Sequence, residues 1–106
     1  MGFFDLLRGA DINQLHRVYS NTEKALLLDV RTPSEFGRGH IPGSKNVPLD
    51  VIDHIGCNIA DKDFPLFVYC HSGARSRLAV KLLNKCGYRS VVDMGGISRY
   101  SGELER

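Results

Sequence analysis

Residues 66–76 read LFVYCHSGARS, and this stretch carries the clearest signal of the fold. The run 66–69 is apolar and typical of a buried strand, residues 71–76 form a polar loop, and an amphipathic helix follows at once. A buried strand that leads directly into a helix is the building unit of sheets whose parallel strands are joined by helices. The stretch therefore predicts an α/β fold with Cys70 at a strand-to-helix turn.

The rest of the sequence continues this alternation. Apolar runs predict strands at 25–30, around 46–47 and at 90–94, and capped amphipathic patterns predict helices at 11–19, from 32, at 50–55 and at 76–85. Strands separated by helices imply a mainly parallel central sheet with helices on both faces. Residues 97–106 carry at most a weak helical pattern. We expect one domain over residues 1–106, with its core from about residue 11 to residue 100.

Length and charge limit the class of protein. A chain of 106 residues can bury one core without metal or disulfide bonds. Its 14 lysine and arginine residues stand against 12 acidic ones and form no basic block, so neither a nucleic-acid nor a membrane-surface partner is indicated. The N-terminus lacks a signal-peptide pattern, and we expect a cytoplasmic protein.

The cysteines give a second limit. Cys57, Cys70 and Cys86 are an odd number, without C-x-x-C or Cys/His ligand spacing, and so predict neither a disulfide framework nor a metal site. Cys86 lies on the apolar stripe of its predicted helix and is expected in the core, whereas Cys57 has no predicted chemical role.

Cys70 carries the strongest chemical signal in the chain. Backbone N–H groups of the loop and the positive end of the following helix converge near the end of its strand, and both favour an anion. Arg75 adds a permanent positive charge five residues further on. These surroundings favour the thiolate, which is the nucleophilic form of cysteine. Ligands of parallel sheets bind beyond the carboxyl ends of the strands, where Cys70 falls. The pattern predicts a nucleophilic cysteine.

The loop after Cys70 supplies the candidate substrate-binding residues. These are His71, Ser72, Gly73, Ala74, Arg75 and Ser76. Two of them have an equally good structural interpretation, since His71 fits an exposed loop histidine and Ser76 fits the N-cap of the next helix. Whether Arg77, Arg99 and Tyr100 line the pocket is not decided by the sequence.

Three motifs together resemble a single-domain rhodanese. They are LDVRTPSEF at 28–36, GHIPGSKNVP at 39–48 and YCHSGARS at 69–76, and the resemblance extends from about residue 25 to residue 96. It implies a rhodanese-like fold and a sulfurtransferase, with Cys70 as the residue that takes up sulfur. The implied donor is a small anion, thiosulfate or a persulfide, and the implied acceptor is a thiol, cyanide or a sulfur-carrier protein. This chemistry needs no metal or organic cofactor.

Other polar residues of these motifs have structural interpretations. Asp29 and Arg31 are expected to form a structural ion pair or to fix a turn, and Glu35 and His40 are expected to support the fold rather than react. One departure concerns the pair 95–96, after which many rhodaneses place a tryptophan. This chain contains no tryptophan and offers Tyr100 instead.

Two alternative functions stay open at this point. A cysteine-dependent phosphatase usually carries C-x5-R, whereas Cys70 and Arg75 form the shorter C-x4-R and Arg77 would give C-x6-R. The shorter loop suits one sulfur atom better than a phosphoryl group. A rhodanese-type protein-binding module without turnover is the other alternative. Loss of the cysteine would favour that module, and Cys70 is present.

Overall fold

A four-stranded parallel sheet forms the centre of the molecule. The computed structural model describes residues 9–55 and 59–106. The strands are β1 (Leu26–Asp29), β2 (Lys45–Asn46), β3 (Leu66–Cys70) and β4 (Val91–Gly96), and they lie in the order β2-β1-β3-β4. Every pairing between neighbouring strands is parallel, which confirms the predicted α/β architecture.

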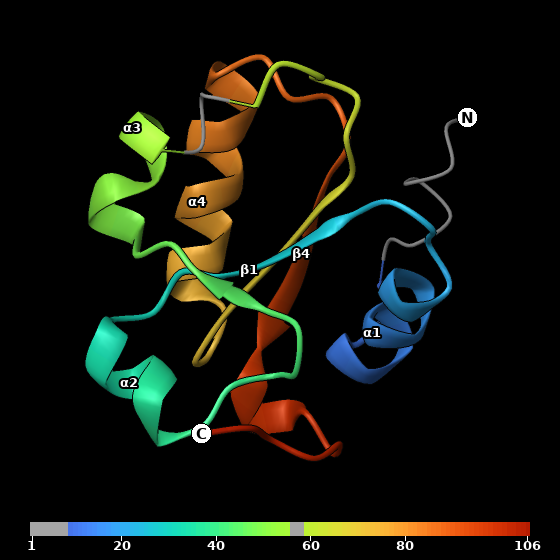
Figure 1. The fold of residues 1–106 in the computed structure, drawn as a ribbon, viewed down its shortest axis with the longest axis vertical. Coiled ribbons are helices and arrows are strands. Elements are labelled where there is room, and N and C mark those ends of the chain that lie inside the picture. The colour runs from blue at the N-terminus through green and yellow to red at the C-terminus, as the bar shows by residue number, and fades with distance from the viewer. Residues whose placement is uncertain (1–8, 56–58) are drawn as a thin grey trace.

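Helices cover both faces of the sheet (Figure 1). The α-helices are α1 (Ile12–Ser20), α2 (Pro33–Arg38), α3 (Ile52–Ile55) and α4 (Ala74–Lys85), and the 3₁₀ turns are η2 (Leu49–Val51) and η4 (Ile97–Arg99). Helix α1 lies on one side of the sheet, and α3 and α4 lie on the other (Figure 1). The buried apolar side chains form two clusters, one on each face of the sheet, because alternate residues of a strand face opposite sides. Phe67 and Tyr69 pack toward α1, and Val68 and Cys70 pack toward α4.

Local capping explains where the first two helices begin. The Asp11 carboxylate accepts the N–H of Gln14, whose side chain accepts the N–H of Asp11. Thr32 and Glu35 form the same reciprocal pair, with a proline at the first helical position between them. These caps satisfy backbone N–H groups that a helix leaves unpaired at its start. The predicted starts of both helices are confirmed.

The helix after Cys70 differs from the prediction. It begins at Ala74 rather than at Ser76, and its N-cap is Gly73. Gly73 adopts a φ of 110°, a conformation that is inexpensive only for glycine, and the chain thereby enters the helix within four residues of Cys70. Ser76 consequently lies inside the first turn and is fully buried, so its interpretation as an N-cap is wrong.

Smaller differences occur at the other ends of the strands. The last strand extends two residues beyond the prediction, to Gly96, through a shift of register opposite Val68 and Tyr69. The tail pairs with an earlier turn through a bridge between His40 and Glu105.

Cys86 is half-buried against the apolar cluster that contains Val68 and Cys70, as expected. It is disulfide-bonded, contrary to the prediction from cysteine spacing. Cys57 lies outside the described residues.

Candidate functional site

Cys70 is a free cysteine at the carboxyl end of the central strand β3. Every residue of this strand is buried, and Cys70 itself is 1% exposed. Its Sγ accepts the backbone N–H of Gly73 at 3.0 Å, across the turn that begins α4. A backbone N–H directed at sulfur stabilises negative charge there. The geometry fits the predicted nucleophilic cysteine.

Strand β4 packs directly against the loop of residues 71–73. A Cβ atom added to Gly96 would lie 2.7 Å from Ser72 Cα and would collide with the carbonyl oxygen of His71. That carbonyl accepts the N–H of Ser98 at 3.1 Å. The absence of a side chain at residue 96 therefore allows the close contact that holds the loop in place.

A small polar network joins the same strand to the start of α4. The Ser76 hydroxyl lies 2.8 Å from Asp93 Oδ1 and 3.0 Å from the carbonyl oxygen of Gly73, and it can donate its one proton to either. Asp93 Oδ1 also accepts the N–H of Gly95 at 3.0 Å. Sequence reasoning missed Asp93, although its place two residues before the glycine pair could have indicated a turn-fixing carboxylate.

Arg75 points at helix α2 and forms a bidentate pair with Glu35. The two N–O distances are 2.7 Å and 2.9 Å. Glu35 also accepts the N–H and the hydroxyl of Thr32. The bonds from Arg75, followed by that from the Thr32 N–H, hold the pKa of the Glu35 carboxyl well below its usual range, and the pair raises the pKa of Arg75. The loop is thus attached to α2 through its arginine.

A second ion pair, between Arg31 and Asp29, is buried. Arg31 Nη2 is 2.7 Å from Asp29 Oδ2 and 2.7 Å from the carbonyl oxygen of Gly39. Their side chains are 7% and 0% exposed, so the predicted structural ion pair is confirmed. His40 also has a structural place, because its ring stacks on Phe36 at 3.7 Å between centroids.

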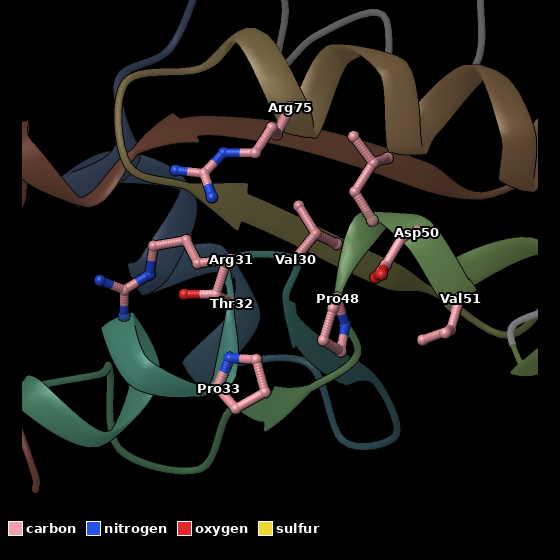
Figure 2. Close-up of a pocket in the computed structure, with 9 residues that line it drawn as sticks. Val30, Arg31, Thr32, Pro33, Pro48, Asp50, Val51 and Arg75 are labelled. Atoms are coloured by element: carbon pink, nitrogen blue, oxygen red, sulfur yellow. The ribbon is translucent and has the colours of Figure 1, made fainter.

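In the part of the chain that the structure describes, residues of the Cys70 loop line three hollows. The first, of about 480 Å³, has Arg75 on one side and Thr32 and Pro33 on the other (Figure 2). The second, of about 360 Å³, is lined by Ser72 and Gly73. The third, of about 350 Å³, is lined by His71. Four of the six predicted loop residues therefore line three separate hollows, whereas Ala74 and Ser76 line none of them.

Three residues that the sequence left undecided are now placed. Arg77 and Arg99 both line the second hollow. Tyr100 instead packs toward α1, with its ring edge-on to His16 at 5.2 Å between centroids, and it lines none of the three hollows. Tyr100 does not take the place of a tryptophan at the loop.

Two further properties concern the described residues only. No group of three or more histidine, cysteine or carboxylate side chains lies in an arrangement that could hold a metal ion within 9–55 and 59–106. No helix in that part of the chain has the length and apolar character needed to cross a membrane.

Comparison with known proteins decides the family. The protein-family model of the rhodanese-like domain matches residues 13–103. The chain belongs to the rhodanese-like domain family. The rhodanese-like domain of the Anabaena protein Alr3790 superposes with a TM-score of 0.80 at 26% identity, covering 91% of this chain and 76% of that one.

Several relatives of this chain are named for sulfur transfer. A sulfurtransferase of Allochromatium vinosum is 37% identical over 86 residues, which are 81% of this chain and 79% of the relative. The thiosulfate sulfurtransferase PspE of Escherichia coli is 35% identical over 71 residues, 66% of this chain and 68% of the relative. The chain spans only 21% of another relative, the adenylyltransferase and sulfurtransferase uba4 of Ogataea parapolymorpha, at 35% identity over 80 residues, 74% of this chain.

Proposed function

We propose that this chain is a sulfurtransferase that takes sulfane sulfur onto Cys70 and passes it to a thiol or to cyanide. The observation that carries the proposal is the position of Cys70 Sγ, 3.0 Å from the Gly73 N–H at the carboxyl end of β3. The relative named thiosulfate sulfurtransferase supports thiosulfate as one donor. A persulfide is the other donor, and a sulfur-carrier protein is a further acceptor, because one relative is named a putative sulfur carrier protein.

In the first step the Cys70 thiolate attacks the terminal sulfur of thiosulfate. A new S–S bond forms to Cys70 as the S–S bond of thiosulfate breaks, and sulfite leaves with the bonding electron pair. The product is a Cys70 persulfide. The Gly73 N–H that contacts Sγ stabilises the anionic sulfur before and after transfer. Ser72, in the same turn, binds the donor, and Arg75, paired with Glu35, holds the turn against α2.

In the second step an acceptor thiolate attacks the outer sulfur of the persulfide. The Cys70 S–S bond breaks, its electron pair returns to Sγ, and the acceptor leaves as a persulfide. Cyanide reacts in the same way and leaves as thiocyanate. Transfer is therefore ping-pong, and neither step consumes an oxidant or a reductant.

Loss of Cys70 is the direct test. Cys70→Ser should reduce sulfur transfer from thiosulfate to cyanide by at least about 1000-fold, because serine lacks the nucleophilic thiolate. Intact-mass measurement after incubation with thiosulfate should show one added sulfur atom on the wild type and none on the variant. Thermal unfolding of both proteins provides the control for folding. A variant that kept half of the wild-type rate would contradict the proposal.

The same assays address the alternative functions. Because only four residues separate Cys70 from Arg75, the turn is too short to direct N–H groups at all oxygens of a phosphate ester. Wild-type protein should therefore leave aryl phosphates unhydrolysed. Cys70-dependent hydrolysis faster than sulfur transfer would identify a phosphatase instead. A folded wild type that neither loads sulfur nor hydrolyses aryl phosphates would point to a protein-binding module.

A further inference from the structure

The second hollow beside the Cys70 loop carries charged side chains of both signs. Its lining includes Arg77 on α4 and Arg99 at the end of η4, together with the acidic residues Asp11 and Asp93. Its volume of about 360 Å³ lies within the range of about 300–1,000 Å³ that is common for small-molecule sites. Sequence positions 11, 77, 93 and 99 meet here because α1, α4 and β4 converge at this end of the sheet.

These charged groups do not neutralise one another. Among residues 9–55 and 59–106, neither Arg77 nor Arg99 forms a salt bridge. Asp11 holds the N–H of Gln14, and Asp93 holds Ser76 and a backbone N–H, so both carboxylates are kept in place by the fold. The hollow thus presents two guanidinium groups and two positioned carboxylates to a molecule that enters it.

The hollow adjoins the turn that contacts the Cys70 sulfur. Ser72 and Gly73 form part of its wall, and the N–H of Gly73 contacts Cys70 Sγ at 3.0 Å. A small molecule bound here would lie against the turn that holds the sulfur. The other two hollows are lined by different loop residues, His71 and Arg75.

We propose that this hollow binds the zwitterionic amino-acid group of the thiol that accepts sulfur from Cys70. Free cysteine and the γ-glutamyl end of glutathione both carry this group. Arg77 and Arg99 pair with the α-carboxylate, as guanidinium groups commonly do, and Asp11 and Asp93 pair with the ammonium group. The inference rests on the proposed sulfurtransfer and names the class of its acceptor.

The bound thiol reacts by the second step already described. Its thiolate attacks the outer sulfur of the Cys70 persulfide, the acceptor becomes a persulfide, and Cys70 recovers its thiolate. The hollow therefore changes the affinity for the acceptor and leaves the formation of the Cys70 persulfide unaffected.

Single-turnover discharge of the persulfide-loaded protein tests the assignment. In Arg77→Ala and Arg99→Ala, the concentrations of cysteine and glutathione that give half-maximal discharge should each rise about tenfold, because one charge-assisted contact is lost. Discharge by 2-mercaptoethanol, which has no charged group, should not change. A rise confined to cysteine or to glutathione would support the site and identify which source of the zwitterion it prefers.

Two further variants make the test specific. Arg17→Ala removes an exposed arginine of α1 that does not line the hollow, and it should leave every rate unchanged. Asp11→Asn retains the helix cap and removes one negative charge. It should lower the affinity for cysteine but not the affinity for 3-mercaptopropionate, which lacks the ammonium group. Unchanged cysteine and glutathione kinetics in both hollow arginine variants would overturn the proposal. An equal rise in the concentration of 2-mercaptoethanol needed for half-maximal discharge would overturn it as well.

An unreactive ligand separates this inference from the proposed function. S-methylcysteine and S-methylglutathione carry the zwitterion but cannot accept sulfur, and their binding can be followed by NMR titration of the unloaded protein. At least one of them should bind, with a dissociation constant that rises about tenfold in Arg99→Ala. Failure of thiosulfate to load Cys70 would contradict the sulfurtransferase proposal alone. Absence of binding by both ligands would overturn the acceptor site alone.

Discussion

At the scale of single residues, Gly96 sets how closely β4 can approach the Cys70 loop. The backbone of this glycine lies against the His71 carbonyl and Ser72, at a distance that leaves no room for a Cβ atom. The neighbouring N–H of Ser98 fixes the same carbonyl. The position of the turn around Cys70 therefore depends on a missing side chain as much as on the groups that are present.

Gly96→Ala should displace the loop and lower the rate of persulfide formation. We expect a loss of about 1–3 kcal/mol in the free energy of unfolding, because the new methyl group overpacks a backbone contact. A shift of the turn by about 1 Å is enough for a rate loss of about 100-fold. Chemical denaturation and the rate of Cys70 loading measure the two effects.

Gly37→Ala is the matched control. Residue 37 lies within α2, and an added Cβ meets no atom within 4 Å there. The substitution should raise the free energy of unfolding by about 0.4–1 kcal/mol, because alanine restricts the unfolded chain. If Gly96→Ala behaved like Gly37→Ala in both measurements, the close contact between β4 and the loop would not matter.

At the scale of elements, the pair of Arg75 and Glu35 joins the first turn of α4 to α2. Glu35 makes two kinds of contact. It accepts the N–H of Thr32 in the cap of α2, and it forms the ion pair with Arg75. The side chains are 22% and 35% exposed for Glu35 and Arg75, so the pair is partly shielded from water and salt. Helix α2 thereby determines where the arginine beside Cys70 points.

Glu35→Gln should weaken this connection while it preserves the cap. The pKa of Glu35 is lowered in the folded state, so its contribution to stability is present above the unfolded pKa and is lost as pH falls toward the folded pKa. Wild-type protein should therefore lose stability on acidification below about pH 5, and the variant should lose less. The comparison is made by denaturation at a series of pH values, and identical pH profiles would contradict it.

At the scale of the whole molecule, the buried ion pair of Asp29 and Arg31 joins separate segments. Asp29 ends β1, and the arginine also binds the carbonyl oxygen of Gly39 after α2. The side-chain amide of Asn46, at the end of β2, donates to the carbonyl oxygens of both residues of the pair. These bonds hold together the carboxyl ends of β1 and β2 and the end of α2.

Asp29→Asn should destabilise the protein by about 3–5 kcal/mol, because it leaves the Arg31 charge buried without a partner. The double variant Asp29→Asn with Arg31→Met should recover much of this loss, since no uncompensated charge remains. Chemical denaturation of both variants provides the measurement. A double variant less stable than Asp29→Asn alone would show that the pair contributes more than mutual neutralisation.

Local patterns were enough to predict much of the fold. The capped starts of α1 and α2 follow from residues three positions apart, and the buried character of β3 follows from an apolar run. The sequence predicts that α4 starts at Ser76, whereas it starts at Ala74, and the contact of Ser76 with Asp93 involves a strand residue 17 positions away. A serine before an amphipathic run looks like a cap when that strand is not in view.

Short-range patterns predict the α/β class, the place of Cys70 at a strand-to-helix turn and the family resemblance of the motifs. These depend on periodicity, caps and spacing, which act between near neighbours in the chain. The folded structure is needed to see that Arg75 points at Glu35, 40 residues away, and that Arg77 and Arg99 line one hollow. Strand order and close packing bring such distant residues together, and neither is written in any short stretch of sequence.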